Sequence, residues 1–531
     1  MTESIIGKNV IESLTTGMYE NPLFVYREYI QNAADAVDHA VKAGVLQKGE
    51  ETISVRIDNE RQEIIIEDNA TGIESAKAFS ILRNIAKSTK QKGIDKGFRG
   101  IGRLGGLAYC QKLTFETSCK GEDVKSIVTW DAEKLQELIN DTEDKSSGEE
   151  VVKEVTSFDS KNEDKEEHYF KVIMEDVTLG DLLNVDEVTN YLQMVAPIDI
   201  NSSFLYKKEI QKYMNEHQLS VDTYNIYING DQIFKPYNSK IYSFDKAGNK
   251  KTAGNVYQVN FFNRKSASGE PLFWGWYSMT SLEGQIPSAN LARGIRLRSA
   301  NIQIGDSEIC KKFFANTSDQ RFSFYFFGEL HALNSKLIPN SRRDYFEDND
   351  ICKEFENAVK EEFLKLKKCC YEVSNLKSCY KKISTANNLK QQIEEKEKKG
   401  YFTNQEEKEE LYKKFSEQKE KEMKARKELD AQLAKLNNSN SPVASLVDRI
   451  GENYNLGTNP AQSSASIPLP EPGLAPASSK TKYRTDGKAY SKMSKAERKL
   501  VGKIYSVISK VFPDEGMRNS LIDKIEEEIT K

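Results

Sequence analysis

Apolar and polar residues alternate with two different periods along the first third of the chain. Around residues 8–19 and 26–41 the apolar positions recur every three or four residues, which predicts helices. Strands are predicted where β-branched and aromatic residues dominate short runs, at 53–58, 63–68, 113–118, 126–131 and 168–176. We therefore expect an α+β domain over residues 1–185, with helices covering one face of a sheet.

Two further segments extend this picture. Residues 138–167 are so polar that we expect a mobile, charged insertion between two strands. Residues 186–350 contain TYNIYING, NVYQVNFFN, LFWGWYSM, GIRLRSANIQI and RFSFYFFGEL, which predict the strands of a second α+β domain. Its aromatic run at 273–277 could form a stacking platform for a ligand, but packing in a β-sheet core is the favoured interpretation.

The last third of the chain changes character twice. Residues 351–437 are charged and helical throughout, with a break at Gly400 and Asn404, so we expect a helical or coiled-coil hairpin. Residues 438–490 are rich in Pro and Ser and predict a disordered linker. Residues 491–531 begin with a capping-box pattern and carry two apolar stripes, which predict a two-helix module.

Composition narrows the cellular setting. Of the 531 residues 30% are charged, but the net charge is only −4, so the chain lacks a global field that would attract nucleic acid. The seven cysteines form no C-x-x-C pair, which disfavours a disulfide framework or a zinc ribbon. No apolar run approaches the ~18 residues of a membrane span. We expect a cytoplasmic protein with no membrane contact.

The helix predicted at 26–41 has two distinct sides. At 100° per residue, Glu28, Asn32 and Asp35 share a narrow arc opposite Ile30 and Val37. A solvated polar face is the simplest interpretation of such a helix taken alone. A polar site lined by the same residues is the alternative, and residues further along the chain decide between the two.

Two more segments carry possible chemistry. The strand EIIIED ends at Asp68 and leads into NATGI, where Gly72 permits close approach to the backbone. The segment NIAKSTKQKGIDKGFRGIGRLGGLAYC, residues 84–110, mixes six glycines with lysines and arginines. Such a segment suits a loop whose backbone N–H groups hold phosphates, although a plain surface loop has the same composition.

The order of these segments resembles the GHKL (Bergerat-fold) ATPase superfamily, which includes the ninety-kilodalton heat-shock chaperone, DNA gyrase, MutL, histidine kinases and MORC proteins. YREYIQNAADA resembles the first family motif, IIIEDNATGI the second and KGFRGIGRLGG the third. The stretch NIAKSTK is similar to the chaperone branch. This resemblance implies a Bergerat-type sandwich that binds ATP and Mg²⁺.

The resemblance also implies roles for individual residues. Glu28 would act as general base toward the attacking water, Asn32 would coordinate Mg²⁺, and Asp68 would accept the adenine amino group. The other implied nucleotide-binding residues are Gly72, Lys87, Ser88, Gly97, Gly100 and Gly102. Asp35 would be structural or would support the adenine pocket from behind.

Two features depart from the family pattern. Ala70 occupies the position of the first glycine in the usual D-x-G-x-G motif. Glu167 and His168 lie near the place of the family's late Gly-Thr, so we assign no threonine to adenine, and we expect a structural role for His168.

The second domain contains NSKLIPNSRRDYFEDND, which resembles the segment of the chaperone's middle domain that supplies an arginine to the terminal phosphate. The candidates are Arg342 and Arg343, and Arg343 is preferred because it directly precedes an acid, as in the family. An exposed basic pair at the start of a helix is the alternative.

Three functions are compatible with these observations. The first is an ATP-hydrolysing machine that closes, dimerises and acts on a protein client or partner, as the heat-shock chaperone does. The second is a DNA clamp of the MutL or MORC type, for which the charge balance gives little support. The third is the ATPase subunit of a multi-gene bacterial system, including antiviral defence.

Overall fold

The computed structural model describes residues 7–14, 21–87, 96, 100–282, 284–439, 441–456, 490, 493–511 and 515–530. Contacts divide the chain into two compact units, Met1–Lys368 and Cys369–Lys531. Among the helices that the structure describes, we find no candidate for a membrane span.

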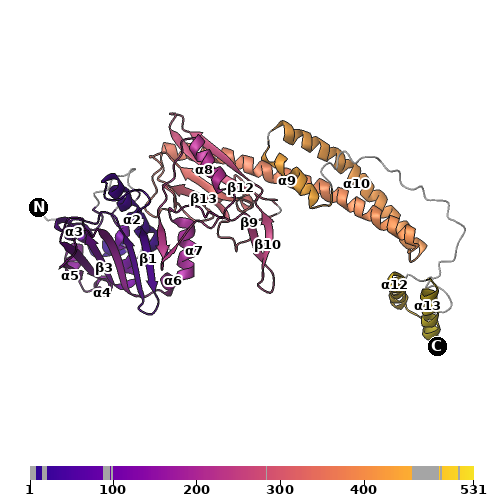
Figure 1. Cartoon of the computed structure of the whole chain (residues 1–531), viewed down its shortest axis with the longest axis horizontal. Helices are drawn as coiled ribbons and strands as arrows, with labels where there is room; N and C mark the ends of the chain where they lie inside the picture. Colours follow the sequence, from indigo (N-terminus) through magenta and orange to yellow (C-terminus); the bar gives the residue numbers. More distant parts are fainter. Residues whose placement is uncertain are drawn as a thin grey trace. The chain divides into compact units, whose positions relative to one another are not determined.

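The first unit begins with a sheet of eight described strands, drawn from indigo to magenta in Figure 1. Its strand order is β5-β4-β3-β6-β2-β1-β7-β8, and all neighbours are antiparallel except β1 and β7. The strands are β1 (Ile53–Asp58), β2 (Glu63–Asp68), β3 (Cys110–Ser118), β4 (Val124–Asp131), β5 (Thr156–Asn162), β6 (Tyr169–Val177), β7 (Ile226–Ile228) and β8 (Asp231–Gln232). The strands predicted between residues 53 and 176 are therefore confirmed within a few residues.

Helices cover this sheet and share its core. They are α1 (Asn9–Leu14), α2 (Phe24–Lys42), α3 (Ser75–Arg83), the 3₁₀ helix η1 (Gly102–Ala108), α4 (Ala132–Asn140), α5 (Gly148–Val155), α6 (Gly180–Leu183) and α7 (Val185–Val195). Ile53, Val55 and Ile57 of β1 are buried whereas Ser54 and Arg56 are exposed, as the two-residue period of a strand dictates. The apolar side of α2 packs into the same core as these isoleucines.

The expectation of a mobile insertion at 138–167 is wrong for most of that segment. Ser147 and Glu150 form a reciprocal capping box that starts α5, and Val151 and Val155 are buried in the core. The following residues form the exposed edge strand β5, paired with β4 along its length. Two valines four residues apart are enough to anchor a short helix even where the surrounding sequence is polar.

The segment TYNIYING also differs from its prediction. It was assigned to the second domain, but β7 pairs in parallel with β1, and β8 completes the edge of the first sheet. The chain passes through α7 and α8 (Lys207–Glu216) before it returns to the first sheet at β7. The boundary predicted at residue 185 therefore does not separate the two sheets.

A second, five-stranded sheet in the same unit has the order β11-β12-β15-β13-β14. Its strands are β11 (Gln258–Lys265), β12 (Pro271–Met279), β13 (Gly294–Ser299), β14 (Ile302–Gln303) and β15 (Phe327–Ala332), and β9 (Lys240–Phe244) with β10 (Lys250–Asn255) forms a separate hairpin. This part of the chain also contains helix α8 (Lys207–Glu216) and the 3₁₀ helices η2 (Ile309–Phe313) and η3 (Gln320–Phe324). The start of RFSFYFFGEL is therefore 3₁₀-helical rather than a strand. Trp274 and Trp276 are buried in its core, which confirms the packing interpretation of the aromatic run.

A cluster of buried charges lies in this second sheet. The Glu329 carboxylate is 2.8 Å from Lys235 Nζ, 2.5 Å from Arg298 Nε and 3.0 Å from His331 Nε2. Despite burial, the nearby cations hold the pKa of Glu329 well below its usual range. Burial and the charge of Arg298 lower the pKa of Lys235 to about 7. Arg298 is therefore the foremost counter-charge of Glu329, followed by Lys235.

The second unit contains the predicted helical hairpin, visible as the orange helices of Figure 1. Helix α9 (Asp350–Lys399) reaches into this unit and is followed by α10 (Gln405–Asn438). Gly400 takes φ +67°, and Asn404 caps α10 by accepting from Glu407 N at 2.7 Å. The antiparallel order follows from two pairs, because Tyr412 contacts Glu397 and Glu428 contacts Cys379.

The region after the hairpin is only partly a linker. Residues Pro442–Leu446 form the 3₁₀ helix η4 and Val447–Glu452 form α11, with Val443 and Ile450 buried. The linker expectation is wrong for these residues, whose apolar positions are spaced for packing, and residues 457–489 lie outside the described part of the chain.

The last two described helices are α12 (Lys495–Val511) and α13 (Glu515–Thr530). The predicted capping box is confirmed, since Ser494 N donates to Glu497 Oε2 at 2.7 Å and Glu497 N donates to Ser494 Oγ at 3.4 Å. Val501 and Ile522 share a small apolar cluster.

Candidate functional site

Helix α2 is buried on its polar side as well as on its apolar side. Glu28, Gln31 and Asp35 are 7%, 1% and 2% exposed, and Asn32 is half-buried. Such polar groups are retained in a protein interior only when other groups compensate for the water that they lose. The interpretation of this side as a solvated face is therefore wrong.

The Glu28 carboxylate is flanked by two guanidinium groups. Its Oε1 atom lies 3.2 Å from Nε of Arg343 and 3.3 Å from Nη2 of Arg27. All three side chains are at most 8% exposed, so little water screens the contacts. Arg27 is the neighbour of Glu28 on α2, whereas Arg343 comes from the loop that follows the second sheet. The ion pair thus joins the two sheets of the first unit.

The backbone around Arg343 is specialised. Arg343 has φ +56°, a left-handed conformation that costs energy for a residue with a side chain. Its carbonyl accepts a hydrogen bond from Gly305 N at 2.9 Å, and its Nη2 donates to the carbonyl of Lys96 at 2.8 Å. By contrast, the side chain of Arg342 is exposed, and only its carbonyl approaches Arg27, at 3.5 Å.

The glycine-rich segment lies against α2 at Gly102. A Cβ atom at this position would collide with the Glu28 carboxylate, so only glycine permits the observed approach. The segment then forms η1, which Tyr29 holds, because its hydroxyl donates to Arg103 O at 3.0 Å and accepts from Gly106 N at 3.1 Å. The side chain of Arg103 donates to Asn84 O, and burial lowers the pKa of Arg103 to about 10.

The remaining residues predicted for this segment are placed unevenly. Gly100 has φ +71°, which favours glycine, and Lys87 is exposed. Ser88 and Gly97 lie outside the described residues.

The turn after β2 is a tightly packed unit. Asp68 is 3% exposed and accepts a hydrogen bond from Ala70 N at 3.1 Å. Ala70 is fully buried as part of the hydrophobic core, so its methyl group packs within the protein. Gly72 has φ +64° and lies against the Ser118 carbonyl, where a Cβ would clash. His168 Nδ1 lies 2.8 Å from Ala70 O, which supports the structural role expected for this histidine.

Comparison with known proteins shows what this domain is similar to. Residues 20–162 match the family model described as histidine kinase-, DNA gyrase B-, and HSP90-like ATPase. The matched range contains α2, the Asp68 turn and the glycine-rich segment, the three places where the motifs lie. Residues 20–162 are therefore similar to the GHKL ATPase superfamily, and the similarity to bacterial HtpG chaperones points to its Hsp90-like branch.

Individual relatives agree with this assignment over a limited length. Chaperone protein HtpG of Shewanella sp. (strain ANA-3) is 27% identical over 158 residues, which is 26% of this chain and 25% of the relative. Chaperone protein HtpG of Shewanella baltica (strain OS155) is 28% identical over the same length. The alignments span about a quarter of this chain and about a quarter of the relatives they match.

The residues on the polar side of α2 fit a magnesium nucleotide. Asn32 offers an amide oxygen one helical turn from Glu28, and the backbone at Gly102 passes directly beside that glutamate. Mg²⁺ in nucleotide sites is held by one or two protein oxygens together with phosphates and water. Within the described residues no group of three His, Cys, Asp or Glu side chains could hold a metal ion without a nucleotide.

Sequence reasoning predicted part of this arrangement and missed part. The structure places both Gly102 and Arg343 against Glu28, and the sequence had assigned all three to one nucleotide site, whose roles stay predictions. It adds Arg27 and Lys96, which were not predicted as site residues. Arg27 carries a weak signal, because it directly precedes Glu28. Lys96 is one of the lysines of the glycine-rich basic segment, but the pattern did not distinguish it from the others.

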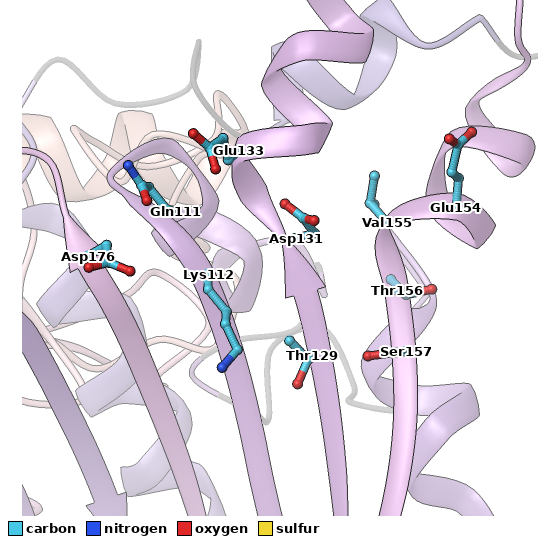
Figure 2. Close-up of a pocket in the computed structure, with 10 residues that line it drawn as sticks. All are labelled: Gln111, Lys112, Thr129, Asp131, Glu133, Glu154, Val155, Thr156, Ser157 and Asp176. Carbon is cyan, nitrogen blue, oxygen red and sulfur yellow. The ribbon is translucent and has the colours of Figure 1, made fainter.

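A separate hollow of about 470 Å³ lies at one end of the first sheet, and Figure 2 shows its lining. The side chains come from the ends of β3 to β6 and from α4 and α5, and four of them are acidic: Asp131, Glu133, Glu154 and Asp176. None of the predicted nucleotide-binding residues lines this hollow, so it is distinct from the site on α2.

Proposed function

We propose that this chain binds ATP with Mg²⁺ and hydrolyses it to ADP and phosphate at the polar side of α2. The observation that carries the proposal is the contact of Glu28 with both Gly102 and Arg343, within a domain of the GHKL superfamily. A carboxylate, a glycine-rich backbone and an arginine are the groups that phosphoryl transfer to water requires.

Each residue has a distinct role in the proposed reaction. Glu28 accepts a proton from the attacking water as general base. Arg343 neutralises negative charge on the terminal phosphate, and its contact with Glu28 supports action of both groups on one phosphate. Asn32 contributes a ligand to Mg²⁺, which when bound neutralises charge on the phosphates.

The adenine end of the nucleotide is assigned to the turn after β2. The Asp68 carboxylate accepts the adenine amino group, and this favours adenine because guanine presents a carbonyl at the same position. We assign the backbone N–H groups of Gly100 and Gly102 to the phosphates, and the roles of Gly97, Lys87 and Ser88 stay predictions from the family resemblance. Gly72 shapes the turn, since its approach to Ser118 leaves no room for a side chain.

The output of hydrolysis is proposed to be mechanical. ATP binding closes the site and favours a homodimer, and the cycle acts on a protein client or partner. Support comes from the chaperone name of the matched relatives, to which this chain aligns over about a quarter of their length. The location of the protein in the cytoplasm belongs to the same proposal.

The test is ATP turnover measured as phosphate release, with and without Mg²⁺. The wild-type chain should hydrolyse ATP only with Mg²⁺, and an excess of GTP should not compete. Size-exclusion chromatography of Glu28→Ala with ATP should show a dimer, because nucleotide is bound and not consumed. Failure to bind ATP in a calorimetric titration would overturn the proposal.

A further inference from the structure

The buried side chain of Lys96 lies between helix α2 and the segment that leads into strand β7. Its side chain is 8% exposed, and Nζ lies 2.5 Å from Asp38 Oδ2 and 2.9 Å from the Tyr224 hydroxyl. A second carboxylate, Asp222, is 3.5 Å away. The Tyr224 hydroxyl in turn donates to Asp38 Oδ1 at 2.7 Å, so ammonium, phenol and carboxylate form a closed triangle.

The main chain of Lys96 is fixed at both of its polar groups. Its N–H donates to Asp35 Oδ1 at 2.9 Å, and its carbonyl accepts from Arg343 Nη2 at 2.8 Å. Asp35 and Asp38 are one turn apart on α2, the helix that also carries Glu28. The same peptide therefore links α2 to the arginine that pairs with Glu28.

The electrostatics favour a charged lysine at this position. Burial opposes the charge, but the hydrogen bond and negative charge of Asp38, with the charges of Asp222 and Asp35, raise the pKa of Lys96 above its ordinary value. Loss of the ammonium would leave Asp35, Asp38 and Asp222 without the cation that they share, although Asp38 and Asp222 keep contact with water.

We propose that Lys96 is a positioning residue for Arg343. Its ammonium group anchors the peptide to Asp38 and Tyr224, and the anchored carbonyl orients the Arg343 guanidinium toward Glu28. The inference rests on the proposed ATPase function, since the position of Arg343 matters for the terminal phosphate. It assigns to Lys96 an indirect role in the rate of hydrolysis, and no role in holding the nucleotide.

A double-mutant cycle tests this role. Lys96→Met should lower kcat for ATP about tenfold and change KM less than about twofold, because an arginine displaced by a fraction of an ångström stabilises the transition state less. In an Arg343→Ala background the same substitution should cause no further loss of kcat. Lys96→Arg, which keeps the positive charge, should restore part of the rate. Lys112→Met, an exposed lysine on β3, is the matched control and should leave kcat unchanged.

Two results would overturn the inference: an equal loss of kcat from Lys96→Met with and without Arg343, or a loss confined to KM. A second readout separates its failure from that of the proposed function. If the wild-type chain shows no turnover, denaturant unfolding of the wild type, Lys96→Met, Arg343→Ala and the double variant tests whether Lys96 and Arg343 are coupled. Destabilisation by Lys96→Met that shrinks in the Arg343→Ala background supports the coupling, and strictly additive destabilisation refutes it.

Discussion

The Nε atom of Arg343 lies 3.2 Å from Oε1 of Glu28, although one residue lies near the start and the other near the end of the sequence of the first unit, Met1–Lys368. Glu28 lies on α2, which packs in the core of the first sheet, and Arg343 lies in the loop after β15 of the second sheet. Because neither is more than 8% exposed, this is a buried ion pair, whose loss on one side leaves an uncompensated charge. The contact holds the guanidinium group of Arg343 beside Glu28, the proposed general base.

Replacement of the arginine should separate catalysis from binding. Arg343→Ala is expected to lower kcat for ATP by at least ~100-fold, because an arginine on a transferring phosphoryl group contributes that much or more. Arg342→Ala is the matched control, since its side chain is exposed, and it should retain wild-type kcat. Steady-state phosphate release measures both. A loss of kcat seen only in Arg342→Ala would show that Arg342, and not Arg343, acts on the phosphate.

The assignment of Asp68 predicts a defect in binding rather than in rate. Asp68→Asn should weaken ATP binding by about 10- to 100-fold, the usual range for losing a hydrogen bond to a charged group. Isothermal titration with Mg²⁺ and ATP measures the affinity, and Asp159→Asn on the exposed strand β5 serves as the control. Wild-type affinity in the Asp68 variant would remove this residue from the adenine site.

The close packing of Gly102 predicts sensitivity to a single methyl group. Gly102→Ala should abolish most ATP turnover, because its Cβ would displace the Glu28 carboxylate. Gly180→Ala adds a methyl group at a position with no neighbouring atom within 4 Å and should leave turnover unchanged. Circular dichroism would confirm that both variants fold. Full activity in Gly102→Ala would show that Glu28 does not need its observed position.

The buried charges of the second sheet predict a pH dependence of stability. Lys235 has a pKa of about 7 when folded, against an ordinary value of 10.5. Between these values the unfolded chain binds more protons than the folded chain, so stability from this group rises with pH and is lost as pH falls toward 7. The slope should reach roughly 1 kcal/mol per pH unit between about pH 8 and 9.

Denaturant unfolding of the wild type and Lys235→Met at several pH values measures this effect. The variant should lose the rise, since its side chain cannot titrate, while Lys240→Met on the exposed start of β9 should keep it. An identical rise in Lys235→Met would mean that another group causes it.

Local patterns predicted much of the fold. Strands β1 and β2 were predicted to the residue, because their two-residue alternation and flanking turns are local signals. The helical hairpin followed from Gly400 and Asn404, which act within one turn of the chain. The pairing of β7 with β1 was not predicted, because register between distant strands depends on contacts that no window of sequence contains.

The candidate site shows the same division. Glu28 and Asn32 could be selected from a helical period and a family motif, and the middle-domain motif pointed to Arg343. The environment of Glu28 could not be predicted, because the contact of Arg343 with the Lys96 carbonyl and the positive φ of Arg343 depend on residues far apart in the sequence. The capped α5 was missed for another reason, since its charged flanks outweighed two buried valines in the composition of the segment.

The most direct test of the central claim is single-turnover hydrolysis of ATP by Glu28→Gln, with enzyme in excess over nucleotide. The account predicts that this variant binds ATP with Mg²⁺ about as tightly as the wild type and cleaves it at least ~100-fold more slowly, because the amide cannot accept a proton from water. Cleavage at the wild-type rate would contradict the assignment of Glu28 as the general base, and with it the proposed site on α2.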